Sequence, residues 1–307
     1  MPSHFAWVDF KEEDRRRMAH ILDLFLEQDT RDELGIGTVR DAIADLLFPG
    51  TSTIQTRARY FLFLPWIYQN YEKKKIAGSD IAKKARQDEV KLIDTLIANG
   101  ESDGVIGIEK RSELQRLPSS IYWAGLGTWH IRCFPGSREQ YHKTWDSLLR
   151  RRDATLFDDD KNIVIASNSV TWDPELPTPP ADFLNTAVLA LTKPEAEYLQ
   201  QRILGLGQTL LGHLVSQTQS TEQVRFIWDH SQSKSFPDKY KVQVEHARLF
   251  SLAMNGASLI YNLMLAELRQ NPEWINLYQT SYESWSSELQ SQVLSFNAWK
   301  RGDFWGV

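Results

Sequence analysis

The sequence is poor in cysteine, glycine and proline, and each shortage excludes a class of protein. A single cysteine, Cys133, among 307 residues excludes an internal disulfide and any zinc site built from several cysteines. Only 16 glycines and 12 prolines exclude collagen-like and low-complexity chains. With 42% apolar and 24% charged residues, the composition is that of an ordered globular protein.

Membrane and export signals are also missing. The longest strongly apolar run, residues 60–68, contains Pro65 and is far shorter than the roughly 18 residues that cross a bilayer. Residues 1–13 lack the basic flank and apolar stretch of a secretory signal. A lone cysteine suits a reducing compartment. We therefore expect a soluble, cytoplasmic protein without membrane contact.

The net charge of −5 is distributed unevenly. Residues 1–50 carry 6 basic and 11 acidic side chains, residues 51–152 carry 18 and 11, and residues 153–307 carry 11 and 18. The basic middle segment either presents a surface to phosphate or to an acidic partner, or complements the acidic segments within one fold.

Apolar residues recur at helical spacing along most of the chain. The pattern predicts a mainly α, multi-helical globular protein with few short strands. The expected helices cover residues 12–27, 38–47, 51–64, 79–98, 121–126, 137–152, 193–204, 208–217, 242–269 and 273–296. Pro65 should kink or end the third of these. The helix over residues 242–269 is apolar nearly all round, which predicts the central buried helix of the C-terminal half.

A domain boundary is expected where acids and prolines cluster. Residues 153–180 predict a linker or long excursion. It would separate a helical N-terminal region, residues 1–152 with the basic segment 51–152, from a helical C-terminal region, residues 181–307.

Residues 38–64 resemble a helix-turn-helix, in which the start of the second helix faces bases or phosphates. A tight Pro-Gly turn precedes the polar residues Thr51, Ser52, Thr53 and Gln55, which would form the first turn of that second helix. Arg57 and Arg59 would add charge, and since they point to different sides of a helix, one of them would contact phosphate. The alternative is an ordinary capped helix whose apolar face enters the core.

A second candidate surface combines arginine with aromatic residues. Arg116, Trp123 and Trp129 suit phosphate binding and base stacking on single strands. Together with Lys143 and the two earlier arginines, Arg116 would line a basic groove. The alternative is that both tryptophans pack in the core.

Catalytic motifs are absent, which disfavours an enzyme. The sequence has no GxSxG, Walker A, GxGxxG or HExxH motif. We therefore predict no catalytic residue, no cofactor and no metal ligand. A metal site assembled from Asp158, Asp159 and Asp160 with distant carboxylates stays open.

Three blocks of sequence resemble an uncharacterised bacterial protein family. They are DTRDELGIGTVRDAIADLLFPGTSTIQTRARYFLFLPWIY at residues 29–68, RLPSSIYWAGLGTW at residues 116–129 and EHARLFSLAMNGASLIYNLMLAE at residues 245–267. The resemblance runs over almost the whole chain and supplies no catalytic residue. It implies a place beside helicases and phospholipase D-like nucleases in antiviral defence clusters.

We therefore expect a non-enzymatic accessory protein of a bacterial antiviral system. It would bind DNA or RNA, or a helicase or nuclease subunit, through residues 51–152. Two alternatives stay open: a protein-interaction scaffold without nucleic-acid contact, and a metal-dependent nuclease or hydrolase.

Overall fold

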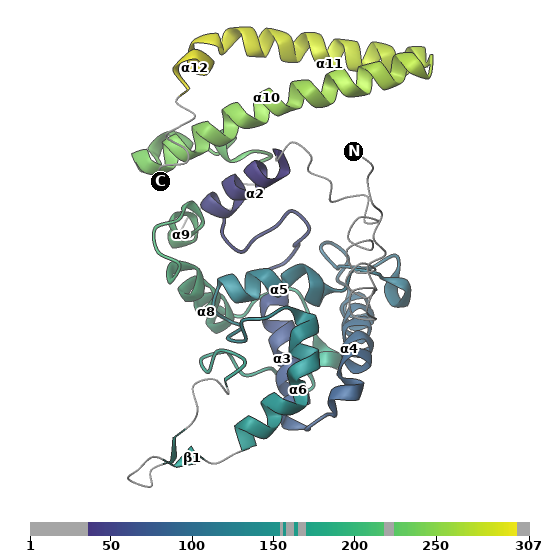
Figure 1. The fold of residues 1–307 in the computed structure, drawn as a ribbon, viewed down its shortest axis with the longest axis vertical. Coiled ribbons are helices and arrows are strands. Elements are labelled where there is room, and N and C mark those ends of the chain that lie inside the picture. The colour runs from purple at the N-terminus through teal and green to yellow at the C-terminus, as the bar shows by residue number, and fades with distance from the viewer. Residues whose placement is uncertain (1–35, 154–155, 158–162, 165–169, 218–223, 300–307) are drawn as a thin grey trace, which may run out of the picture. The chain divides into compact units, whose positions relative to one another are not determined.

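The protein is mainly α (Figure 1), as the sequence predicts. The computed structural model describes residues 36–153, 156–157, 163–164, 170–217 and 224–299. The chain divides into two units, residues 1–43 and 44–307, with the boundary inside the helix α2. The helix expected over residues 12–27 lies outside the described residues.

Helices make up most of the described chain. They are α2 (Ile36–Leu47), α3 (Tyr60–Lys73), α4 (Gly78–Ala98), α5 (Pro118–Thr128), α6 (Arg138–Asp153), α7 (Phe183–Thr186), α8 (Lys193–Leu204), α9 (Leu210–Ser216), α10 (Asp238–Leu268), α11 (Pro272–Ser291) and α12 (Val293–Ala298), with 3-10 turns at Arg111–Glu113, Ile227–Asp229 and Ser233–Ser235. The strands β1 (Leu156–Phe157) and β2 (Ile163–Val164) pair antiparallel.

Helix α3 is the central helix of the core in residues 44–307. Its sequence begins YFLFLPWIY, apolar on every side, and eleven of its fourteen residues are buried. Pro65 lies inside the helix, which continues to Lys73, so of the two expected effects, a kink or an end, Pro65 does not end the helix. The indole of Trp66 donates a hydrogen bond to the carbonyl of Pro177 at 2.6 Å, which satisfies a buried polar group.

The second helix of the expected helix-turn-helix does not begin at Thr51. Residues 48–59 are non-helical, and α3 starts at Tyr60. The hydroxyl of Tyr122 accepts the backbone N–H groups of Thr56 and Arg57 at 2.8 and 3.1 Å, so a side chain replaces helical bonding there. A connection of this length also exceeds the three or four residues of a helix-turn-helix turn.

Aromatic rings fill the space between α3, α5 and α6. The ring of Tyr68 stacks on Trp172, with centroids 5.8 Å apart, and meets Tyr141 at 5.5 Å. Trp123 lies 5.5 Å from Tyr141 and nearly perpendicular to Trp172 at 6.0 Å. Edge and offset contacts of this kind stabilise a core beyond simple burial. Much of the tryptophan surplus therefore serves packing.

Residues 170–203 belong to the same core as α3 to α6. Trp172 lies in the aromatic cluster, and Phe183 stacks on Phe63 with centroids 6.4 Å apart. The Thr95 hydroxyl of α4 donates to the carbonyl of Leu184 at 2.7 Å. Residues 170–180 of the expected linker and the start of the expected C-terminal region therefore pack directly on the N-terminal helices.

Helices α10 and α11 form an antiparallel hairpin (Figure 1). Buried and half-buried residues of α10 recur at intervals of three and four, the spacing of a coiled coil. They are Leu249, Leu252, Gly256, Leu259, Leu263 and Ala266. The matching half-buried residues of α11 are Ile275, Tyr278, Tyr282, Trp285 and Leu289. The indole of Trp285 donates to the carbonyl of Leu252 at 2.8 Å and covers Gly256.

We expect Gly256→Ala to destabilise the hairpin by about 1–2 kcal/mol, because overpacking costs about 1–3 kcal/mol and alanine recovers up to ~1 kcal/mol of helix propensity. A β-carbon at Gly256 would overlap the ring of Trp285, which is held by its hydrogen bond to Leu252. Urea unfolding followed by circular dichroism measures the change. Asn255→Ala, at the exposed neighbouring position, is the control and should keep or slightly raise stability. Equal stability of Gly256→Ala and the wild type would contradict the close packing.

The expectation that α10 is a central buried helix is wrong. Ile260, Tyr261, Met264 and Leu268 are all exposed, Leu268 to 81%. By length and composition alone, α10 is the one described helix that meets the criteria for a membrane span, and 22% of its most apolar window is buried. The role of central helix belongs to α3.

Candidate anion-binding surface

The two arginines expected to face phosphate have opposite environments. Arg57 is partly exposed and forms an ion pair with the exposed carboxylate of Asp103. Arg59 is 5% exposed. Its guanidinium donates to Glu195 Oε1 at 2.7 Å and to the carbonyl of Val188 at 2.9 Å. Arg59 is therefore a structural residue of the core, which corrects its assignment as a phosphate contact.

The two tryptophans expected to stack bases are also part of the core. Trp123 is buried, and its indole donates to the carbonyl of Gly136 at 3.0 Å. Trp129 is buried, donates to the carbonyl of Pro49 at 2.8 Å, and stacks on Phe61 with centroids 3.9 Å apart. Other side chains already contact the faces or edges of these rings. Both tryptophans therefore pack in the core, which is the alternative to base stacking.

Other predicted residues do reach the surface. Ser52 and Thr53 are exposed, whereas Thr51 donates its hydroxyl hydrogen to the carbonyl of Phe48 at 2.8 Å. The Gln55 amide donates to the carbonyl of Gly50 at 3.3 Å. These groups shape a turn and form no helix N-terminus.

Arg116 and Lys143 are the two predicted cations that stay both exposed and unpaired within the described chain. Arg116 precedes α5, and Lys143 lies on α6. The continuous groove expected from Arg57, Arg59, Arg116 and Lys143 does not exist as such, because Arg59 is buried.

Residues 51–152 carry seven more basic than acidic side chains. Three of the acids, Glu72, Asp88 and Glu89, are buried, and Glu72 and Asp88 pair with Arg152 and Lys84. The rest of the excess lies mainly on exposed side chains. A surface with this excess attracts anions over a distance of about one Debye length.

A hollow of about 420 Å³ concentrates part of this charge. Lys73 and Lys74 at the end of α3 and Lys91 of α4 line it, and α7 with the residues before it closes the other side. All three lysines are exposed and without an ion pair in the described chain. The side-chain amides of Asn70 and Asn185 add hydrogen-bond donors. One carboxylate, Asp182, also lines the hollow, so the three lysines outnumber it. Cations and amide donors around one concavity are typical of an anion site.

A smaller hollow of about 300 Å³ adjoins the first and shares Lys73 with it. Arg152 lines this hollow, and Glu72 holds its guanidinium in place. Arg152 donates to Glu72 Oε2 at 2.9 Å and to the Glu72 carbonyl at 3.0 Å. The buried carboxylate of Glu72 also accepts the Tyr141 hydroxyl at 2.8 Å and that of Thr171. Arg152 is thereby oriented, although its charge is largely balanced.

The residues that line these two hollows are not among the binding residues predicted from the sequence. Lys73, Lys74 and Lys75 form a visible basic run, which usually marks a solvated helix end. Their significance comes from Lys91, which α4 brings to the same hollow, and from the loop that ends at Asn185. The positions of Lys91 and of this loop beside Lys73 and Lys74 depend on tertiary packing, which the order of residues in the sequence does not reveal.

A buried polar cluster joins α3, α4, α5 and α6. Glu89 Oε2 accepts the backbone N–H of Ser119 at 2.8 Å, and Ser119 Oγ accepts from Arg138 at 2.9 Å. Tyr68 and His142 share a hydrogen bond of 2.9 Å. Burial raises the pKa of Glu89 to about 7 and lowers the pKa of His142 to about 4. Glu89 and Ser119 line none of the three hollows of about 300, 420 and 960 Å³, and their hydrogen bonds link α4, α5 and α6.

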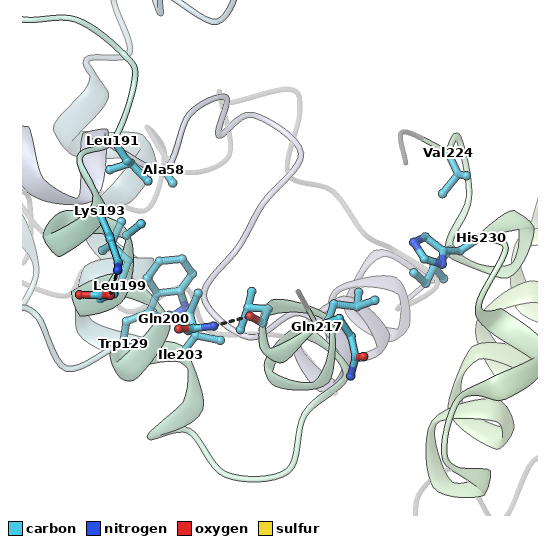
Figure 2. A pocket seen from close by; sticks show the side chains of 15 residues that line it. Ala58, Trp129, Leu191, Lys193, Leu199, Gln200, Ile203, Gln217, Val224 and His230 are labelled. Atoms are coloured by element: carbon cyan, nitrogen blue, oxygen red, sulfur yellow. Dashed lines mark hydrogen bonds and ion pairs between the residues drawn. The ribbon is translucent and has the colours of Figure 1, made fainter. Parts of the chain in front are cut away.

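A larger hollow of about 960 Å³ lies beside α8 (Figure 2). Its polar side chains bind neighbours instead of converging on one point. Lys193 pairs with Glu197 at 3.7 Å, and the Gln200 amide donates to the carbonyl of Val215 at 2.5 Å. Lys193 and Gln200 line one side of the hollow in Figure 2, and His230 lines the other. This arrangement holds no catalytic constellation among the residues drawn.

Metal-binding groups are likewise not assembled in the described part of the chain, where no three His, Cys, Asp or Glu side chains come together. Asp158, Asp159 and Asp160, proposed from the sequence as the seed of a metal site, lie outside the described residues.

Comparison with known proteins gives one match. Residues 2–307 match a family of unknown function, DUF6361. No curated protein and no solved structure matches the chain. The resemblance to an uncharacterised family, deduced from three blocks of sequence, is confirmed over nearly the full length.

Proposed function

The chain belongs to DUF6361, a family without a known activity, and from its own surface we propose that it is a non-enzymatic accessory protein that binds nucleic acid. The observation that carries this proposal is the group of Lys73, Lys74 and Lys91 around one hollow, none of which forms an ion pair with another described residue. Exposed lysines of this kind commonly bind the phosphate groups of nucleic acids.

A polymeric anion fits better than a small one. The lysines are flexible and exposed, so each contributes a point charge without the buried, fixed donors that select a metabolite. Further exposed cations extend beyond the hollow. They are Lys75, Lys83, Lys110, Arg111, Arg116, Lys143, Arg150 and Arg151. A chain of phosphates would contact several of these at once, and each contact would release counterions.

Stacking on aromatic rings has little part in this proposal. Trp123 and Trp129 are committed to the core, so recognition would rest on the phosphate backbone. We therefore expect weak dependence on base sequence and similar binding of DNA and RNA of equal length and strandedness.

We expect Lys73→Ala, Lys74→Ala and Lys91→Ala, combined in one variant, to weaken binding of a generic oligonucleotide about 10- to 100-fold near 0.1 M salt. The slope of log K against log salt should fall in magnitude by roughly two to three, because each lost phosphate contact removes about 0.9. Fluorescence anisotropy over a salt series measures both quantities.

The matched control removes the same charge elsewhere. Lys234→Ala, Lys239→Ala and Lys241→Ala replace three exposed lysines outside residues 51–152. This variant should bind within about twofold of the wild type, since long-range charge effects are largely screened at 0.1 M salt. Equal losses in both variants would reduce the effect to net charge, and no wild-type binding would overturn the proposal.

Three other predictions do not follow from the cationic surface. A place in an antiviral system, a helicase or nuclease partner and a cytoplasmic location stay predictions that rest on the sequence. The two alternative functions, a scaffold and a nuclease, predict different results with the oligonucleotide. A scaffold would not bind it and would instead bind protein partners. A nuclease would degrade it when Mg²⁺ or Mn²⁺ is added.

A further inference from the structure

Helix α10 carries a second apolar row beside the one that packs on α11. Its residues are Phe250, Ala253, Ala257, Ile260, Tyr261, Met264 and Leu268, here called the α10 stripe. Phe250, Ala253, Ala257, Ile260 and Met264 each follow by one residue a member of the row that packs on α11, so they face about 100° away from that row. Tyr261 and Leu268 lie one turn beyond Ala257 and Met264. All members of the stripe are half-buried or exposed. A helix with two such rows normally has two helical neighbours.

We propose that the α10 stripe binds the α10 stripe of a second copy, antiparallel, so that two hairpins form a four-helix assembly. After Phe250, the stripe is small at Ala253 and Ala257 and large from Ile260 to Leu268. A two-fold axis between Ala257 and Ile260 places Met264 of one copy opposite Ala253 of the other. Large residues then fill the space beside small ones, which makes the surface complementary to itself.

The charge pattern suits an identical partner. Residues 249–266 contain no charged side chain, so two copies approach along the stripe without like-charge repulsion. A strongly charged partner would find no counter-charge there. The interface is therefore apolar and neutral on both sides.

The exposed area reaches the size of a specific interface. The four large residues at the end of the stripe are 41% to 81% exposed. At about 200 Å² for each large side chain, they offer about 500 Å² per copy, or roughly 1,000 Å² for a pair. Ala257 and the half-buried Phe250 and Ala253 add to this area.

A lipid bilayer fits the same helix less well. Helix α11 is packed along α10, and its exposed residues include Glu273, Glu283 and Glu288. Inserting α10 would bring these carboxylates toward the apolar interior or strip α11 away, and either change is costly.

The test is sedimentation equilibrium of the full chain at about 50 µM, a concentration that populates dimers with micromolar dissociation constants. The wild type should sediment near twice its 35.5 kDa and remain dimeric at about 0.5 M salt, because apolar contacts are not screened. Met264→Lys and Ile260→Lys, tested separately, should each weaken dimerisation at least about tenfold, since each buries an unpaired charge.

Pairing geometry is tested by charge complementation. Ala253→Glu alone should also weaken the dimer, whereas a mixture with Met264→Lys should recover a heterodimer, because the antiparallel register places these residues opposite each other. Leu277→Lys, an equally exposed apolar position on α11, is the control and should stay dimeric. Circular dichroism confirms that each variant keeps its helices.

Three results would overturn the proposal. They are a monomeric wild type at this concentration, a dimer that both lysine variants leave intact, and a protein that is monomeric in solution but sediments with phosphatidylcholine–phosphatidylglycerol vesicles. The stripe lies outside the cationic segment, so its variants should leave oligonucleotide binding by each monomer unchanged.

Discussion

Arg59→Ala is expected to lower the free energy of unfolding by about 3–5 kcal/mol, the usual result of breaking a buried ion pair from one side. Glu195 is itself buried, and its Oε1 accepts from Arg59 at 2.7 Å. Removing the guanidinium leaves this carboxylate without its counter-charge and the carbonyl of Val188 without a donor. Urea unfolding measured by tryptophan fluorescence gives the difference.

Arg57→Ala is the matched control for this measurement. Arg57 lies two residues earlier and also pairs with an acid, Asp103, but 40% of its side chain and 90% of its partner's are exposed. Exposed pairs contribute about 0–1 kcal/mol, so stability should change little. Similar losses at Arg57 and Arg59 would contradict the contrast between a surface pair and a buried one.

The difference between the exposed Arg57 and the buried Arg59 also affects the interpretation of binding assays with arginine variants. A variant that combines Arg57→Ala with Arg59→Ala would lose binding through loss of the fold, and the result would resemble loss of a phosphate contact. The lysines of the hollow avoid this confusion, because they are exposed and their replacement leaves no buried charge.

Glu89→Gln is expected to abolish part of the pH dependence of folding. Burial raises the pKa of Glu89 from 4.5 to about 7 in the folded protein. Below about pH 4.5 both folded and unfolded states hold the proton, so the stability from the neutral carboxyl is fully present. As pH rises toward 7, the unfolded state alone releases the proton, and stability falls by on the order of 3 kcal/mol before levelling off.

The decisive measurement is the stability difference between Glu89→Gln and the wild type from pH 5 to pH 8. This difference should grow in favour of the variant by a few kcal/mol, because the amide stays neutral throughout. His142, whose lowered pKa acts below neutral pH, is present in both proteins and cancels. Glu113→Gln, at an exposed glutamate, should keep the wild-type pH dependence. Parallel curves for Glu89→Gln and the wild type would contradict a buried neutral carboxyl.

Much of the helical architecture could be predicted because hydrophobic periodicity is local. The helix expected over residues 193–204 has those bounds, and α4 and α6 begin and end within one residue of expectation. The start of α3 was missed because the polar residues after Pro49 are good helix caps in isolation. The chain stays non-helical up to Tyr60, and the backbone N–H groups of Thr56 and Arg57 bond instead to Tyr122, which lies more than sixty residues away in sequence.

The candidate site could be predicted less well, because it depends on which charges the core removes. Arg57 and Arg59 look equivalent in sequence, and their environments differ only through Glu195 and Asp103. The apolar composition of α10 predicted a central helix buried nearly all round, whereas α10 packs one row on α11 and leaves a second row exposed. Periodicity reveals which residues share a face and does not reveal whether a neighbour covers it.

The bond between Arg59 and Glu195 spans 136 residues, and this separation sets an order of events during synthesis. At about 5–20 residues per second, the ribosome needs on the order of ten seconds to extend the chain from one partner to the other. For most of that interval the apolar faces of α3 and α4 lack Trp172 and Phe183, and Tyr198 follows only after Glu195; all three belong to the same core. The nascent chain therefore exposes apolar surface until translation has passed α8, and chaperone binding should concentrate in this window.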